Sequence, residues 1–234
     1  MDDEKIIKKQ NKSPFILRIL GMGAPYFVKT PWWLKKIYPN RVWDIDTNEK
    51  IIYLSFDDGP HPEATPFVLD ELAKYNAKAT FFCIGKNVVD YPDIYKRILD
   101  EGHAIGNHTQ QHLNGWKTST EIYLTDVSEA AKNISSNLFR PPYGRIKRSQ
   151  AKGISEALKN KSAKIVMWDV LSGDFDMSLS NEKCLENVIS KTRTGSIVVF
   201  HDSEKAFSRL KYTLPAMLEF FTLKGYVFSK IKIE

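Results

Sequence analysis

The feature that most constrains the fold of this chain is a repeated alternation between short apolar, β-rich runs and stretches of helical period. Seven runs predict strands, at residues 51–56, 79–84, 103–106, 138–140, 164–169, 196–201 and 226–230. Because helical signals fall between these runs, the alternation predicts an α/β fold with a parallel sheet. Such a sheet is either closed as a (β/α) barrel or open and doubly wound.

Several local signals predict where helices begin and which face they bury. Thr65 followed by Pro66 is typical of a helix N-cap with proline in the first turn, and Thr118 with Glu121 is typical of a capping box. Four apolar residues with the spacing of one helix face are Leu214, Met217, Leu218 and Phe221. Each helix can therefore bury one stripe against the sheet.

Length and composition predict a single globular domain. A chain of 234 residues that is 42% hydrophobic and 26% charged is typical of one such domain. Residues 1–49 have no clear period and are predicted to form an N-terminal arm of undetermined role, followed by the domain at residues 50–234. Cys83 and Cys184 form no CxxC pattern, which indicates buried apolar side chains rather than a disulfide framework or a cysteine zinc site.

Charge and hydropathy restrict the classes of binding partner and the cellular location that we expect. The net charge of +6 favours anionic partners, but the 34 basic residues are scattered among 28 acidic ones, so no nucleic-acid site is expected. No apolar run is long enough to cross a membrane. The acidic start and the interruption of residues 15–28 by Arg18 are not typical of a signal peptide. A cytoplasmic location is the default expectation, with the cell envelope as the alternative.

Two adjacent carboxylates, Asp57 and Asp58, stand at the end of the first predicted strand, before the dipeptide Gly59-Pro60. Their charges repel one another in a tight space unless a cation stabilises them. A metal ion would do so, although an ordinary acidic turn has the same composition. Only one of the two carboxylates needs to bind a metal, which leaves the other available as a base.

His108 and His112 follow the third predicted strand, and their spacing of four would place both imidazoles on one side of a helical turn. That arrangement suits a shared metal ion, whereas the alternative is a chance pair of surface histidines. The chain has only five histidines, which favours ligation. One aspartate and two histidines would leave room for water, as in a catalytic rather than a structural metal site.

Three further polar segments follow later predicted strands: RPPYG at residues 140–144, WDVLSGDF at 168–175 and VFHD at 199–202. Arg140 could pair with a carboxylate, or it could be a solvated arginine in a loop stiffened by prolines. All of these segments lie at the carboxyl ends of predicted strands. This placement favours the barrel over the open sheet, because the carboxyl ends of barrel strands converge at one mouth.

In order along the chain, SFDDGP, HTQQH, RPPYG, WDVLSGDF and VFHD resemble the motifs of polysaccharide deacetylases, the NodB-homology enzymes of carbohydrate esterase family 4. The resemblance covers about residues 50–230. It implies a distorted (β/α) barrel of about seven parallel strands. It also implies a hydrolase that removes N-acetyl groups from N-acetylhexosamine residues of a polysaccharide such as peptidoglycan or a chitin-type glycan.

The resemblance further implies how a metal and a base would be arranged. One divalent ion, with zinc expected, would be bound by Asp58, His108 and His112. Asp57 would be the catalytic base, and Arg140 would position it. An N-acetylated glycan would be the substrate.

The remaining roles implied by the resemblance concern the leaving group and the acetyl group. His201 would be the general acid, oriented by Asp174, and the Tyr143 backbone N–H would help to stabilise the oxyanion. Trp168 and Val199 could wall the acetyl pocket, or they could be ordinary core residues.

Two positions depart from the family pattern. Leu171 stands where many members carry an additional aspartate, and Phe175 stands where tryptophan is usual. Neither change removes a predicted ligand or proton-transfer group, so they bear on substrate fit. Two alternatives stay open: hydrolysis of another amide or an acetyl ester by the same metal site, and a non-catalytic carbohydrate-binding protein on the same fold.

Overall fold

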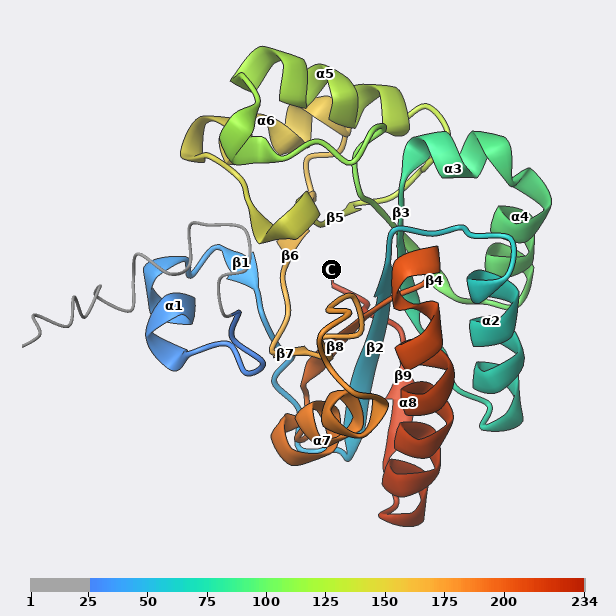
Figure 1. Cartoon of the computed structure of the whole chain (residues 1–234). Coiled ribbons are helices and arrows are strands. Elements are labelled where there is room, and N and C mark those ends of the chain that lie inside the picture. The colour runs from blue at the N-terminus through green and yellow to red at the C-terminus, as the bar shows by residue number, and fades with distance from the viewer. Residues whose placement is uncertain (1–25, 234) are drawn as a thin grey trace, which may run out of the picture.

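The sheet is built around β2 (Ile51–Asp57), which pairs in parallel with three other strands. The computed structural model describes residues 26–233 and gives the strand order β1-β6-β5-β4-β3-β2-β8-β7, with β9 beside β2. All named strand pairs are parallel, and the sheet curls into the predicted distorted barrel with helices around it (Figure 1).

All seven predicted strands are confirmed. Besides β2, they are β3 (Thr80–Cys83), β4 (Ala104–Asn107), β5 (Leu138–Phe139), β6 (Lys164–Val166), β8 (Ile197–His201) and β9 (Val227–Ser229). Two strands were not predicted, β1 (Arg41–Val42) and β7 (Val170–Leu171). Two residues are too few to show a period, so the sequence pattern could not predict these strands. They are strands because they pair with β6 and β8.

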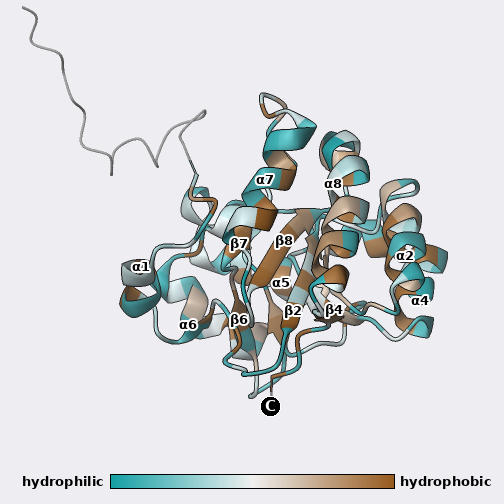
Figure 2. Ribbon diagram, turned by 90° about the horizontal axis from the view of Figure 1, so that it is seen from below, coloured by the Kyte–Doolittle hydropathy of each residue, from teal (hydrophilic) through white to brown (hydrophobic). Residues whose placement is uncertain are grey.

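The helices of the described residues follow the strands as crossover connections and small covering elements. They are α1 (Trp32–Ile37), α2 (Ala64–Lys74), α3 (Gly85–Asp90), α4 (Pro92–Asp100), α5 (Thr120–Ala130), α6 (Arg148–Ala157), α7 (Asn181–Lys191) and α8 (Glu204–Leu223). The predicted apolar face of α8 is buried, as expected. Figure 2 shows hydrophobic residues concentrated on the central strands and hydrophilic ones on the outer helix faces.

Two predicted helix caps are wrong by one or two residues. Helix α2 has Glu63 at its N-cap, and the Thr65 hydroxyl instead bonds the His61 N–H and the Asp202 carboxylate. Helix α5 is capped by Ser119, whose hydroxyl accepts from the Ile122 N–H at 3.3 Å. At α5 the neighbouring serine thus takes the capping role predicted for Thr118. At α2 the His61 ring instead accepts the backbone N–H groups of Glu63 and Ala64.

The largest apolar cluster of the core lies around β2 and its neighbours. Phe56 stacks between Phe81 of β3 and Phe200 of β8, with ring-centroid distances of 5.1 and 5.9 Å. Cys83 and Cys184 are buried and unpaired, as predicted. None of the helices among residues 26–233 is sufficiently long and apolar to span a membrane.

Part of the predicted N-terminal arm contributes to the sheet. Strand β1 pairs with β6 at one edge, and Lys29 forms an antiparallel bridge with Val170 of β7 at the other edge. Residues 29–42 therefore connect the two edges of the curled sheet. The predicted domain boundary between residues 49 and 50 stays a prediction, and residues 1–25, on which the signal-peptide prediction depends, lie outside the described residues.

Candidate metal centre and active site

Asp58, His108 and His112 come together at the carboxyl ends of β2 and β4. One ligand atom from each lies within 4.8 Å of the other two. Asp58 Oδ1 is 3.1 Å from His112 Nε2 and 3.7 Å from His108 Nε2, yet it accepts no well-aligned hydrogen bond. A buried carboxylate oxygen that faces two imidazoles without such a bond is suited to a cation.

The two histidines converge by a route that differs from the predicted helical turn. Residues 108–112 form an irregular loop, in which Thr109 and His112 have positive φ angles of 67° and 56°. The Asp126 carboxylate fixes this loop by accepting the backbone N–H groups of Gln110 and Gln111, at 3.0 and 3.1 Å. The helical explanation was therefore wrong, although the imidazole rings do lie 5.1 Å apart.

The protonation of His108 suits a metal ligand. Its Nδ1 lies 2.7 Å from the Arg140 carbonyl, which can only accept, so Nδ1 carries the proton and Nε2 faces Asp58. Burial lowers the pKa of His108 to about 4, which keeps the imidazole neutral. Burial acts to raise the pKa of Asp58, but the contact with His112 and nearby positive charge outweigh it and hold that pKa low. Neutral imidazole and ionised carboxylate are the forms that bind metal.

Asp57 points to a fully buried arginine. Arg140 Nη1 donates to Asp57 Oδ1 at 2.6 Å and to the Ser55 hydroxyl at 2.8 Å, while Nη2 donates to the Met167 carbonyl at 2.8 Å. The guanidinium carbon also lies 4.0 Å from the ring centroid of Phe82. So many contacts leave Arg140 one orientation, which in turn fixes the Asp57 carboxylate next to Asp58.

His201 and Asp174 form a second hydrogen-bonded pair at the same mouth, in which Asp174 is fully buried and His201 is partly exposed. His201 Nδ1 lies 2.7 Å from Asp174 Oδ1, and the His201 backbone N–H donates to Asp174 Oδ2 at 2.7 Å. Burial acts to lower the pKa of His201, but the charge and hydrogen bond of Asp174 outweigh it and raise the pKa to about 9. His201 therefore holds a proton at neutral pH, as a general acid must.

Comparison with known proteins decides the family. The family model "Polysaccharide deacetylase" matches residues 44–159. The chain is 36% identical over 195 residues to a peptidoglycan-N-acetylglucosamine deacetylase of Bacillus cereus, covering 81% of this chain and 90% of the relative. The chain belongs to the polysaccharide deacetylase family.

Two further comparisons concern a longer relative and a solved structure. Peptidoglycan-N-acetylmuramic acid deacetylase PdaC of Bacillus subtilis is 33% identical over 68% of this chain, and the chain spans only 33% of its length. A crystal structure of a peptidoglycan N-acetylglucosamine deacetylase with a bound benzamide compound is 30% identical, with a TM-score of 0.72 over 86% of this chain and 95% of that one. This family defines the enzyme class, a hydrolase that deacetylates polysaccharides.

The other predicted site residues of this deacetylase lie around the same mouth. Tyr143 is 59% exposed at a φ of 59°, and its ring lies 4.6 Å from the His112 ring. Trp168 is half-buried beside Gly144, where an added Cβ would lie 2.7 Å from the indole. Val199 is fully buried, as a core residue is. Their roles in oxyanion and acetyl binding stay predictions.

Asp202, the last residue of the VFHD motif, adjoins the site but had no predicted role. Its carboxylate accepts the Gly59 N–H at 3.1 Å, and an added Cβ at Gly59 would lie 2.0 Å from it. Burial raises the pKa of Asp202 to about 8. Asp202 thus fixes the turn that follows Asp58. Its place directly after His201 was the only sequence signal, and that signal said nothing about a contact with residue 59.

Residues from the N-terminal segment also reach the active-site loops. Tyr26 donates from its hydroxyl to Asp176 at 3.1 Å and packs on Phe175, with ring centroids 5.1 Å apart. Phe175 in turn contacts His201 edge-on at 5.1 Å. Asp169 is fully buried and pairs with two lysines of the same segment, Lys29 and Lys35. Residues 26–35 therefore pack against the segment after β7 that carries Asp174, the partner of His201.

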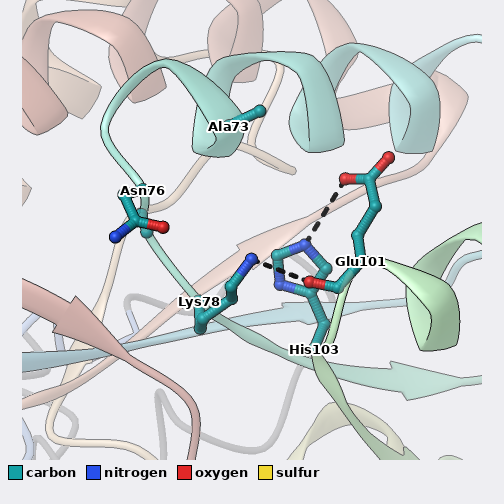
Figure 3. A pocket seen from close by; sticks show the side chains of 6 residues that line it. Ala73, Asn76, Lys78, Glu101 and His103 are labelled. Carbon is teal, nitrogen blue, oxygen red and sulfur yellow. Dashed lines mark hydrogen bonds and ion pairs between the residues drawn. The ribbon is translucent and has the colours of Figure 1, made fainter.

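Two cavities in the described part of the chain lie at the opposite end of the strands. One of about 280 Å³ is lined by Ala73, Asn76, Ala77, Lys78, Glu101 and His103 (Figure 3), and a second of about 690 Å³ also includes His103. His103 precedes β4, whereas His108 follows it. Both cavities therefore lie away from the metal triad, although both contain His103 and the first also contains Glu101.

Proposed function

We propose that this deacetylase uses one divalent ion, zinc being the expected one, to hydrolyse N-acetyl groups of N-acetylhexosamine residues in a glycan. The observation that carries the proposal is the joint placement of three groups at one mouth. They are the ligand set Asp58, His108 and His112, the Asp57–Arg140 pair and the His201–Asp174 pair. Each group supplies a different part of an amide hydrolysis.

An amide bond needs both an activated water and a protonated leaving group. A divalent ion, when bound, supplies Lewis acidity for water and for the amide carbonyl. Asp57, held by Arg140, accepts the proton that water gives up. His201 donates its proton to the departing amine, and Asp174 keeps the imidazole oriented so that Nε2 faces outward from the pair. The Tyr143 N–H is proposed to stabilise the oxyanion.

Peptidoglycan is the substrate that the family comparison favours. The relatives reported above are named for removing acetyl groups from N-acetylglucosamine or N-acetylmuramic acid of peptidoglycan. A shared fold alone would not support this transfer, because function depends on the site. Two observations support the transfer here. Asp57 and His201 are each hydrogen-bonded to a partner, and the three proposed metal donors lie within 4.8 Å of one another.

The proposal is tested by acetate release from chitooligosaccharides and from peptidoglycan. Protein stripped of metal is compared with the same protein after zinc is restored. Zinc-dependent release is expected, and its ratio between the two glycans ranks the substrates. Stoichiometric zinc binding without release from either glycan would overturn the proposal in favour of another amide or an acetyl ester.

A further inference from the structure

An exposed aromatic and basic surface adjoins the metal triad. We call it the ledge and define it by Trp116, Tyr143 and Arg145. Trp116 is 45% exposed and Tyr143 is 59% exposed, and the Arg145 guanidinium lies 5.2 Å from the Trp116 ring centroid. Exposed large aromatic side chains gathered beside a site are typical of ligand contacts rather than of folding.

The ledge is continuous with the metal triad. Tyr143 contacts His112 ring to ring at 4.6 Å, and Trp116 follows His112 by four residues. The two loops that carry Trp116 and Arg145 meet at Gly115, where an added Cβ would lie 2.3 Å from the Arg145 carbonyl oxygen. A ligand seated at the metal would therefore extend directly onto the ledge.

The backbone beneath Trp116 is fixed. The Asn114 side chain accepts the Trp116 N–H at 3.1 Å, and the Gln150 amide donates to the Gly115 carbonyl at 2.9 Å. Gln150 is fully buried. The backbone that carries the exposed indole is therefore anchored, which reduces the entropy lost when a ligand binds.

The chain segments that carry Trp116, Tyr143 and Arg145 are rich in basic residues. Residues 113–120 and 143–155 contain Lys117, Arg145, Lys147, Arg148 and Lys152 but neither aspartate nor glutamate. Among residues 26–233, the ion pairs include no carboxylate bound to Arg145. A guanidinium that is stacked, accessible and without a carboxylate partner is suited to bidentate recognition of a ligand carboxylate.

We propose that the ledge is a substrate subsite for a carboxylate-bearing unit adjacent to the N-acetylhexosamine that is deacetylated. Trp116 packs against the sugar ring and Arg145 binds the carboxylate, which a sugar acid or an attached peptide could supply. The inference rests on the proposed function and deepens it, because it predicts preference for an acidic glycan over a neutral chitin-type one.

The test compares one peptidoglycan fragment with the same fragment after its carboxylates have been converted to amides. Dissociation constants are measured by calorimetry in an Asp57→Asn background, which prevents turnover during the titration. We expect the untreated fragment to bind about tenfold more tightly, the usual scale of one exposed charge-assisted pair. Arg145→Gln should abolish this difference and leave binding of the amidated fragment unchanged.

Two further variants separate charge and stacking. Lys161→Gln removes the same charge from an exposed residue outside the ledge and should keep the tenfold preference. Trp116→Ala should weaken binding of both fragments alike, and Trp116→Phe should restore most of it. Equal affinities for the two fragments in the parent protein, or a preference that persists in Arg145→Gln, would overturn the subsite. Because binding is the readout, a failure of acetate release would count against the proposed function alone.

Discussion

Two histidines stand beside carboxylates at opposite ends of the barrel strands. At the carboxyl end, His201 lies 2.7 Å from Asp174 and its pKa is raised to about 9. At the amino end, His103 lies 3.8 Å from Glu101 (Figure 3), and its pKa is lowered to about 4. A histidine beside a carboxylate is thus protonated at neutral pH at one end and neutral at the other.

The difference comes from hydrogen bonds and neighbouring charges. Burial lowers the pKa of both histidines, but at His201 a fully buried carboxylate in direct contact outweighs it. At His103 the Lys78 charge adds to the effect of burial, and the His103 Nδ1 accepts the Ala79 N–H at 3.1 Å. His103 is therefore neutral at neutral pH and has no proton to donate.

The largest expected effect comes from removing a metal donor. His108→Ala should abolish stoichiometric zinc binding and reduce acetate release by at least about 10⁴-fold, because the ion supplies several kcal/mol of transition-state stabilisation. Zinc content and initial rates measure both effects. The matched control is His103→Ala, which removes a buried histidine from the other end and should retain zinc and a rate within about twofold. A comparable loss of rate in His103→Ala would contradict the prediction that only the carboxyl ends of the strands carry the active site.

Asp57→Asn should separate the base from the metal. We expect acetate release to fall about 10³-fold while zinc is bound with unchanged stoichiometry, because only the proton acceptor is lost. Metal analysis and rate measurement on the same sample test this. Full turnover by the variant would show that another group is the base.

His201→Gln should affect only reactions whose leaving group needs a proton. Deacetylation of an N-acetyl sugar should slow about 10²-fold, whereas hydrolysis of an activated acetyl ester should change less than about threefold. Parallel assays with both substrates give the ratio. An equal loss on amide and ester would point to a positional role for His201.

The smallest expected effect concerns the free energy of unfolding. Its dependence on pH should have opposite signs for the two histidines. Since the folded pKa of His201 is raised to about 9, its contribution is fully present below about pH 6.5 and is lost as pH rises through 9. His103, with its pKa lowered to about 4, instead costs stability as pH falls from 6.5 towards 4. Each pKa shift corresponds to about 3 kcal/mol in the free energy of unfolding.

Urea unfolding of the metal-free protein across this pH range measures both contributions. His201→Gln should flatten the alkaline side of the stability curve, and His103→Gln should flatten the acidic side. Curves with the same shape in both variants would contradict the opposite shifts.

Much of the architecture was predictable, because alternating patterns are local. The seven predicted strands were found, whereas β1 and β7 were missed because two residues carry no period. The pairing of His108 with His112 was expected from their spacing, but the loop geometry was not, since Asp126 fixes it from a different part of the chain. Likewise, the motif that contains Asp202 was noticed, but its contact with Gly59 depends on β2 and β8 lying side by side.

The sequence by itself determined which chemical groups stand at strand ends and in what order, and therefore the α/β class and the family resemblance. Only the tertiary structure decided the protonation of the groups. The His108 tautomer depends on the Arg140 carbonyl, and the high pKa of His201 depends on Asp174, each about thirty residues distant along the chain. The physical reason is that electrostatic environments are set by atoms close in space, and the curl of the sheet decides which atoms those are.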